Sequence, residues 1–393
     1  MASSSASSSA SAAAAAASPA PSDPPVPSGT AAGPGAPATS GAEAPARTGS
    51  STPSGPATPS GPATASGTPA PPGASAPSGA SPDPASRARS ALRSELAALT
   101  TEAFRPDLAD IDRLPTLDIA RIMNGEDAGV PAAVAARLPE IAAAIDATAA
   151  RMARGGRLVY AGAGTAGRLG VLDASECPPT FNTDPSQVMG VIAGGATALV
   201  TAVEGAEDSL ELAAGDLAAL GVGPADTVVG ISASGRTPYA VGAVEHARAA
   251  GALTIGVSCN AGSPLGRAAD HAIEVVVGPE LLTGSTRLKA GTAQKLVLNM
   301  LSTITMIRLG KTYGNLMVDV RATNDKLRAR SRQIVALATG ASEQEIEAAL
   351  TETGGEVKHA ILVVLGGVDG RTAARLLDES GGHLRTALQT AHG

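Results

Sequence analysis

Cysteine and histidine are scarce in this sequence. Its 393 residues contain two cysteines, Cys177 and Cys259, and five scattered histidines. The cysteines follow no disulfide framework, so we expect them to be free thiols, as in a reducing compartment. The histidines have no spacing typical of metal ligands. The sequence therefore predicts no metal site.

Positive charge is also in short supply. The chain has 29 basic and 36 acidic residues, a formal net charge of -7, and no dense Lys/Arg stripe. Because nucleic-acid-binding faces are strongly basic, we expect no nucleic acid partner. The run after Met1 lacks a basic segment typical of a secretory signal, and the apolar run Ala12–Ala17 is too short to span a membrane. We therefore expect a cytoplasmic protein that does not bind membranes.

The N-terminal region lacks the apolar side chains that a core requires. Residues 1–95 are dominated by Ala, Ser, Pro, Gly and Thr, with a tandem TPSGPA repeat from Thr52 to Ala63. A segment of this composition buries too little apolar surface to offset the entropy of ordering it. We expect residues 1–95 to form a disordered, low-complexity tail.

Apolar runs typical of buried strands begin after this region and alternate with Ala-rich helical stretches. This alternation predicts a parallel sheet with helices on both faces. The expected fold is α/β, a three-layer αβα sandwich with a five-stranded parallel, flavodoxin-like sheet. Its five predicted strands are Arg157–Ala161, Val188–Ala193, Thr227–Ser232, Leu253–Ser258 and Ala272–Val277.

Helical patterns flank the predicted sheet. Leu117–Ala150 indicates two helices broken near Gly129–Pro131, and Thr286–Leu309 indicates one long helix, with Gly284 and Ser285 as capping candidates and Gly310 at its end. We expect residues 110–320 to form one domain. A small helical subdomain is expected over 325–393, with a capping box at Ser342 and Glu345 and four helices, Lys326–Ala338, Glu343–Thr353, Val357–Leu365 and Thr372–Ser380.

A glycine-rich turn follows the first predicted strand. The stretch Leu158–Thr180, LVYAGAGTAGRLGVLDASECPPT, combines an apolar run, this turn and a helix start. Backbone N–H groups at such a turn can hold an anion. Glu176, about a dozen residues further on, could face the bound ligand.

Two other interpretations of this turn are open. Its glycines spell GxGxxG, the pattern of dinucleotide-binding enzymes, but the second predicted strand ends in Ala193, Gly194 and Gly195, where such a fold needs an acidic residue. A purely structural tight turn is the better of these two interpretations.

A second loop, ISASGRTP, follows the third predicted strand. It carries hydroxyls at Ser232, Ser234 and Thr237 ahead of a helix that opens at Pro238. Several short donors at a helix N-terminus suit a phosphate, although a structural turn with an N-cap explains the same residues. Two such loops at the carboxyl ends of neighbouring parallel strands favour ligand binding.

An acidic cluster, Glu204, Glu207 and Asp208, opens the helical stretch after the second strand. An isolated cluster of this kind is usually solvent-exposed and favoured by the helix dipole. Here Glu207 and Glu176 come from different segments of one predicted sheet. Two carboxylates that converge on one ligand could act as a general acid and a general base.

The blocks around these motifs resemble the N-acetylmuramic acid 6-phosphate etherases, which carry a sugar isomerase (SIS) domain. The resemblance runs from about Asp112 to about Leu388. The blocks occur in family order: LVYAGAGTAGRLGVLDASECPPTF, GVIAGG, AVEGAEDS, ISASGRTPY, GVSCN, TGSTRLKAGTAQKLVLNMLST and GNLMVDVRATNDKL. It implies a cofactor-independent lyase that cleaves the C3 ether of a sugar phosphate, N-acetylmuramic acid 6-phosphate, to N-acetylglucosamine 6-phosphate and D-lactate in cell-wall sugar recycling.

The resemblance also implies roles for the site residues. Glu176 would protonate the departing lactate oxygen and Glu207 would remove the C2 proton, although these two roles could be exchanged. The phosphate would be held by two groups of residues, Ser232, Ser234 and Thr237 in one loop and Gly164, Thr165 and Arg168 in the other.

One position departs from the family pattern. Ala166 stands where the family turn usually has serine, and this loss of a hydroxyl could weaken phosphate binding by about 0.5–1.5 kcal/mol unless Thr165 substitutes.

The resemblance leaves other functions open. A sugar-phosphate sensor would keep the phosphate loops without catalysis, and an aldose–ketose isomerase would not need an acid aimed at a C3 leaving group. Retention of both glutamates favours the lyase. The resemblance further implies a homodimer with the site near the subunit boundary, where the block from Lys289 to Lys295 could reach across.

Overall fold

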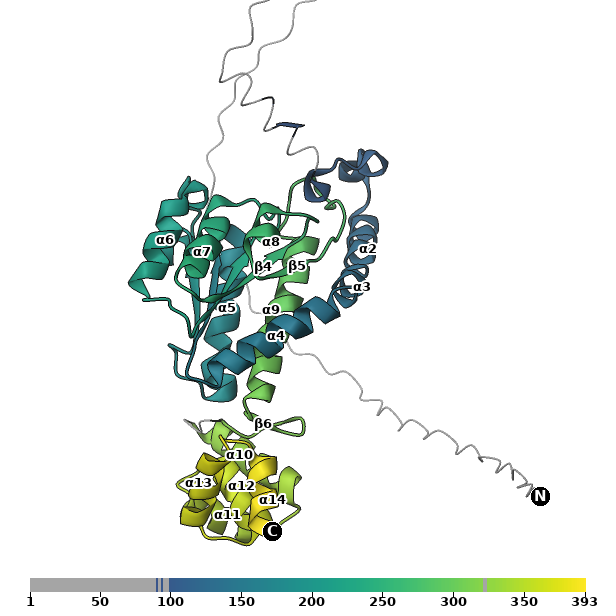
Figure 1. The fold of residues 1–393 in the computed structure, drawn as a ribbon. Coiled ribbons are helices and arrows are strands. Elements are labelled where there is room, and N and C mark those ends of the chain that lie inside the picture. The colour runs from purple at the N-terminus through teal and green to yellow at the C-terminus, as the bar shows by residue number, and fades with distance from the viewer. Residues whose placement is uncertain (1–89, 91–92, 95–98, 321–323) are drawn as a thin grey trace, which may run out of the picture. The chain divides into compact units, whose positions relative to one another are not determined.

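The computed structural model describes residues 90, 93–94, 99–320 and 324–393 (Figure 1). All of them belong to one compact unit, Ser78–Gly393. Apart from residues 90 and 93–94, the predicted tail lies outside the described residues. Statements about the rest of the fold refer to the described ranges.

Five parallel strands form the central sheet, as predicted. The order β2-β1-β3-β4-β5 places β1 between β2 and β3. Gly162 at the end of β1 pairs with Ile192 of β2 and with Ile231 of β3, so these three strands end level with one another. The strands are β1 Leu158–Gly162, β2 Val188–Ile192, β3 Thr227–Ile231, β4 Leu253–Ser258 and β5 His271–Glu274.

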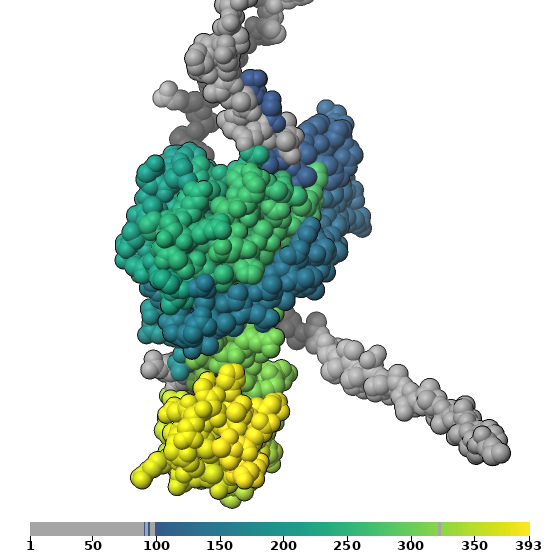
Figure 2. All heavy atoms as spheres, viewed as in Figure 1, coloured from purple at the N-terminus to yellow at the C-terminus, as the bar shows by residue number. Residues whose placement is uncertain are grey.

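Helices cover both faces of the sheet, which confirms the three-layer sandwich. Alternate β1 residues point to opposite cores: Tyr160 packs in the layer with α4, α5 and α9, whereas Val159 packs in the layer with α6 and α7. In the space-filling view of Figure 2 the sheet is covered by the teal and green segments that pack over it. The helices are α2 Thr116–Asp127, α3 Val130–Ala135, α4 Leu138–Met152, α5 Gly164–Phe181, α6 Leu210–Ala219, α7 Pro238–Ala249, α8 Pro264–Ala268 and α9 Lys289–Arg308.

Short 3-10 helices occupy several connections. They are η1 Thr100–Glu102, η2 Pro106–Leu108, η3 Ile111–Arg113, η4 Gly195–Leu199 and η5 Ala206–Asp208. The last of these contains Glu207, so the acidic cluster precedes α6 instead of opening it.

Two helix boundaries differ from the prediction. The segment predicted as two helices contains three, because the chain breaks again at Arg137 and α4 restarts with Pro139 in its first turn, where proline is tolerated. The long helix α9 begins at Lys289 instead of Thr286. Gly284 and Ser285 do not cap it; the buried carboxylate of Glu280 accepts the N–H groups of Lys289 (3.0 Å) and Ala290 (2.9 Å).

A separate apolar core holds the C-terminal helices together. It is built from residues of α10–α14 with Val318 and Val320. Ser342 and Glu345 form the predicted capping box. The prediction missed the hairpin β6–β7 and the last helix, α14. The elements are β6 Thr312–Tyr313, β7 Leu316–Met317, α10 Asp325–Thr339, α11 Glu343–Glu352, α12 Val357–Gly366, α13 Gly370–Glu379 and α14 Leu384–His392.

Among the described residues, no single helix is both long enough and apolar enough to cross a membrane. The bent pair Thr116–Ala135 and Leu138–Met152 meets the length and composition of a span only when its two parts are taken together.

Candidate functional site

A cavity of about 450 Å³ lies at the carboxyl ends of β1 and β3. The strand order reverses between these two strands, and open parallel sheets bind ligands at that point. The cavity is polar on several sides. Its lining includes Gly164, Thr165 and Ala166 after β1, Ser232, Ser234, Arg236 and Thr237 after β3, Glu207 and Asp208 of η5, Leu99 and Glu102 near the described N-terminus, and Thr286 and Gln294 of the α9 region.

The loop after β3 presents a cluster of hydroxyls. Ser232 Oγ lies 2.8 Å from Thr237 Oγ1 and 3.3 Å from Ser234 Oγ, and it accepts the N–H of Gly235. Ser234 Oγ accepts the N–H of Arg236 at 3.1 Å. These bonds form the structural turn that was the alternative interpretation, but Thr237 makes no side-chain cap on α7. The turn thus holds the three hydroxyls in one place beside the cavity.

The turn after β1 leads directly into α5. Gly164 is the first helical residue and has a positive φ of 53°. Ala163 before it provides no side-chain cap, so α5 presents its N-terminal N–H groups at the cavity. An 18-residue helix that starts here favours an anionic ligand through its dipole.

Close packing accounts for Gly162 and Gly167 of the GxGxxG pattern, whereas Gly164 has open space and a positive φ of 53°. A Cβ added to Gly167 would lie 2.6 Å from the carbonyl oxygen of Gly162 and 2.6 Å from Ile192 Cγ1. Strand β2 ends at Ile192 and continues into Ala193 and Gly194, so the acidic residue of a dinucleotide site is absent there. Helix–strand contact at Gly162 and Gly167, together with the positive φ of Gly164, explains the pattern without a dinucleotide.

A smaller cavity, of about 160 Å³, adjoins the first and shares Ala163, Gly164 and Glu207 with it. Arg168 and Glu204 line this smaller cavity. The Arg168 side chain donates from Nε to the carbonyl oxygen of Leu199 at 3.0 Å. Arg168 therefore lies beside the smaller cavity and does not line the one that holds the serine cluster.

Glu176 lies elsewhere in the chain. It is an exposed residue twelve positions beyond Gly164 on α5, about 18 Å further along the helix axis. It borders a third cavity, of about 530 Å³, with residues of α9 and the β6–β7 hairpin. The SECPP stretch that carries Glu176 belongs to α5, which runs from Gly164 to Phe181. Within one chain the structure does not bring Glu176 to Glu207.

A buried carboxylate stands one turn before Glu176. Asp173 accepts hydrogen bonds from Tyr160 Oη and Asn299 Nδ2, both at 2.7 Å, and from Ser302 Oγ at 3.2 Å. Burial raises the pKa of Asp173 above its usual range despite these three donors. The network joins β1, α5 and α9, which fixes the helix face that carries Glu176.

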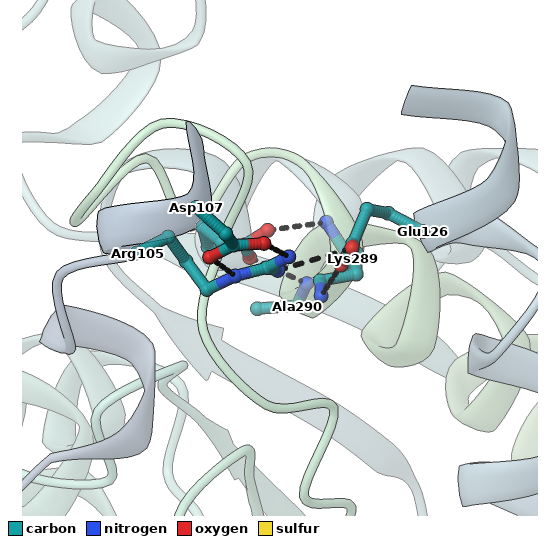
Figure 3. A network of polar contacts seen from close by, with 6 residues as sticks. Arg105, Asp107, Glu126, Lys289 and Ala290 are labelled. Carbon is teal, nitrogen blue, oxygen red and sulfur yellow. Dashed lines mark hydrogen bonds and ion pairs between the residues drawn. The ribbon is translucent and has the colours of Figure 1, made fainter. Parts of the chain in front are cut away.

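Charged side chains secure the beginning of α9 next to the site (Figure 3). Lys289 is nearly buried and forms an ion pair with Glu126 of α2, which also pairs with Arg105 at 3.0 Å. Hydrogen bonds from Lys289 and Arg105 lower the pKa of Glu126. Lys289 therefore pairs with a residue of its own chain, Glu126, whereas Lys295 of the same predicted block is exposed.

Several lining residues were not predicted as site residues, among them Arg236, Gln294 and Glu102. Arg236 stands between the predicted Ser234 and Thr237, so its positive charge in that loop was a usable signal. Gln294 lies within a helical block and Glu102 lies about 60 residues before Gly164, and nothing in their local sequence indicates the cavity.

Two family models match parts of the chain that include the sheet. The family model "Glucokinase regulatory protein N-terminal SIS domain" matches residues 140–248, and the model "SIS domain" matches residues 207–304. A solved structure of a phosphoheptose isomerase from Francisella tularensis covers 49% of this chain and 100% of that chain, at 21% identity and a TM-score of 0.39.

Two curated relatives match most of the chain. An N-acetylmuramic acid 6-phosphate etherase of Streptomyces avermitilis is 80% identical over 301 residues, which are 77% of this chain and 97% of the relative. An enzyme of the same name from Rubrobacter xylanophilus is 60% identical over 75% of this chain and 97% of the relative. The chain belongs to the N-acetylmuramic acid 6-phosphate etherase family.

Proposed function

We infer that this chain is a lyase that breaks the C3 ether of N-acetylmuramic acid 6-phosphate and releases D-lactate and N-acetylglucosamine 6-phosphate in amino sugar recycling. The observation that carries this inference is 80% identity to an etherase over 97% of that relative's length. The polar cavity at the ends of β1 and β3 provides a matching site for a sugar phosphate.

The phosphate would lie between the two loops. The hydroxyls of Ser232, Ser234 and Thr237 face it from one side, and the N-terminus of α5 faces it from the other. Hydroxyl and N–H donors can satisfy several phosphate oxygens at once, and the helix dipole adds a favourable field. Arg168, beside the smaller cavity, would contact the part of the substrate that extends past Gly164.

The reaction needs one base and one acid. With the sugar in its open aldehyde form, a carboxylate removes the proton at C2, the C3–O bond breaks, and lactate leaves with a proton from the acid. Water then adds across the C2–C3 double bond of the unsaturated aldehyde: its oxygen bonds to C3 as the product hydroxyl, and C2 regains a proton. Glu207 lines the phosphate cavity, so we assign it the C2 proton.

The acid role of Glu176 requires a second subunit. Its carboxylate is about 18 Å along α5 from the loop that holds the phosphate, too far to act on the same sugar within one chain. We propose a homodimer in which Glu176 of the partner subunit reaches the cavity that contains Glu207. The exposed position of Glu176 on α5 agrees with this arrangement.

The first experiment tests the reaction itself. Purified protein is incubated with N-acetylmuramic acid 6-phosphate, and D-lactate is measured with time. Steady release supports the lyase, whereas binding of the sugar phosphate without lactate release would instead make this chain a sensor. We propose that the enzyme acts in the cytoplasm, where the two buried thiols, Cys177 and Cys259, stay reduced.

Subunit mixing tests the shared site. The Glu176→Gln and Glu207→Gln proteins, each of which we expect to be inactive alone, are mixed and allowed to exchange subunits. If the two carboxylates come from different subunits, half of the dimers are mixed and each has one intact site, so about a quarter of wild-type activity returns. If both act within one chain, or the protein is a monomer, no activity returns.

A further inference from the structure

Gln294 of α9 has a buried amide nitrogen that makes no hydrogen bond with any of the described residues. The residue is 1% exposed, and its Nε2 has no hydrogen-bond partner among the described residues. It lies in the second turn of α9 and lines the 450 Å³ cavity together with Ser232 and Ser234. Buried polar groups are nearly always hydrogen-bonded, so an amide that faces a cavity without a partner indicates a ligand.

The same face of α9 lies against the phosphate turn after β1. A Cβ added to Gly291, one helical turn before Gln294, would be 3.5 Å from Thr165 Cγ2. Residues three apart on a helix share a face. Gln294 thus faces the region of Thr165 and Ala166, both of which also line the cavity.

Ala166 supplies no side-chain donor at its own position beside the cavity. Its methyl group is nearly buried and occupies the position at which the family pattern has a serine hydroxyl. The amide nitrogen of Gln294 is a neutral donor that lines the same cavity and has no hydrogen-bond partner among the described residues.

We propose that Gln294 binds the substrate phosphate, with Nε2 donating to an oxygen that a serine at position 166 would otherwise contact. This proposal rests on the proposed function, because it concerns the phosphate of the same substrate. Gln294 is a binding residue and takes no part in proton transfer. Its contact is made equally in the bound substrate and in the transition state, so it contributes to affinity and little to turnover.

Gln294→Met tests the contact, because methionine keeps the length of the side chain and removes the donor. We expect the dissociation constant of N-acetylglucosamine 6-phosphate, measured by calorimetry, to rise about 10-fold or more, with a parallel rise in KM and a small change in kcat. Thr305→Val is the matched control: it removes another buried, unpartnered polar group from α9 that does not line the cavity.

Ala166→Ser tests the shared oxygen. The added hydroxyl should improve affinity more in the Gln294→Met protein than in the wild type, because it replaces the lost donor. Equal effects in the two backgrounds would overturn the pairing of Gln294 with position 166. Unchanged affinity in Gln294→Met would overturn the contact itself.

These outcomes are separable from failure of the proposed function. A wild type that binds N-acetylglucosamine 6-phosphate but releases no lactate contradicts the lyase and leaves Gln294 testable by binding. If Gln294→Met does not fold, as judged by its thermal transition, Gln294→Glu keeps the size and places a carboxylate beside the phosphate. That variant should lose affinity further, and unchanged affinity there would also overturn the proposal.

Discussion

Glu207 borders both cavities at the ends of the strands, whereas Glu176 borders neither of them within its own chain. Both side chains are exposed, and neither makes a structural hydrogen bond among the described residues. Replacing either carboxylate with an amide should therefore leave folding intact and remove only its chemical role.

Glu176→Gln and Glu207→Gln should each lower kcat for lactate release by roughly 100-fold or more, which is the scale of general acid–base catalysis. The assignment of roles is tested in deuterium oxide. If Glu207 is the base, exchange of the C2 proton with solvent should stop in Glu207→Gln. Exchange that continues there would move the base to the other carboxylate, and wild-type turnover by either variant would remove that residue from the mechanism.

The hydroxyl cluster should contribute to binding more than to turnover. Ser232→Ala with Ser234→Ala removes two donors beside the cavity, so KM should rise more than kcat falls, because phosphate is held similarly in ground and transition states. N-acetylmuramic acid without the phosphate should be a very poor substrate for the wild type. Equal rates with and without the 6-phosphate would refute the assignment of both loops.

At the residue scale, the sequence predicted the local cluster of hydroxyls correctly but did not predict how far Glu176 lies from it. Ser232, Ser234 and Thr237 cluster because they lie within six residues after one strand. Glu176 was expected to face the ligand because it is a carboxylate about a dozen residues after the glycine-rich turn. Those prolines occupy the last turn of α5, which ends with Asn182 in a left-handed conformation, so the helix carries Glu176 away from the loop.

Among the elements, the contact between α5 and the strand ends depends on Gly167. Gly167→Ala would place a methyl group 2.6 Å from the backbone carbonyl oxygen of Gly162, which cannot move without shifting β1. We expect a loss of unfolding free energy of about 1–3 kcal/mol, measured by denaturant unfolding. Gly215→Ala, in the middle of α6 with open space around it, is the control and should stabilise by about 0.5–1 kcal/mol. A Gly167→Ala protein as stable as the wild type would contradict the packing argument.

The opposite ends of β1 and β3 are joined by an ion pair. Arg157 donates to Asp226 from Nε at 3.0 Å and from Nη2 at 2.7 Å, and Gly223 N–H donates at 3.0 Å. Burial would raise the pKa of Asp226, but these hydrogen bonds outweigh it and the pKa is lowered. The pair therefore stabilises the fold above the unfolded-state pKa of about 3.9 and loses this effect as pH falls toward the lowered folded-state pKa.

Asp226→Asn should cost about 3–5 kcal/mol of unfolding free energy at pH 7, because it leaves a partly buried guanidinium without its counter-charge. The difference from the wild type should shrink in unfolding experiments below about pH 4. If the difference in unfolding free energy between Asp226→Asn and the wild type stayed constant from pH 7 to pH 3, the negative charge of Asp226 would not be the cause of the stabilisation. Exposed Asp378→Asn serves as the control and should change little.

Element boundaries show what local sequence can determine. The strands were found because parallel strands buried on both faces are short apolar runs, as in the fully buried β1, β3 and β4. The start of α9 was missed because its cap, Glu280, belongs to the preceding loop and approaches only after the chain folds. Helix α14 was missed because it closely follows Gly381 and Gly382, a pair of residues typical of a turn.

At the scale of the whole chain, the described N-terminal residues belong to the site. Leu99 and Glu102 line the cavity of about 450 Å³. Asn260 accepts the N–H of Thr100 at 2.9 Å and donates to Thr101 Oγ1 at 3.2 Å. Gly284 donates its N–H to the carbonyl oxygen of Thr101 at 3.3 Å. The predicted tail ends at residue 95, and these contacts require that the folded core after it include Leu99.

Two truncations test where the functional chain begins. Deleting residues 2–87 should leave the thermal transition and lactate release unchanged, because that segment has too little apolar surface to offset an ordering entropy of roughly 1–2 kcal/mol per residue. Deleting residues 2–103 also removes Leu99, Thr101 and Glu102, so it should lower the melting temperature and raise KM. Limited proteolysis of the full chain should stop before Leu99. If the shorter deletion aggregated or lost activity, the predicted tail would have to contribute to the fold; if the longer one behaved like the wild type, the contacts with Asn260 would have no part in forming the site.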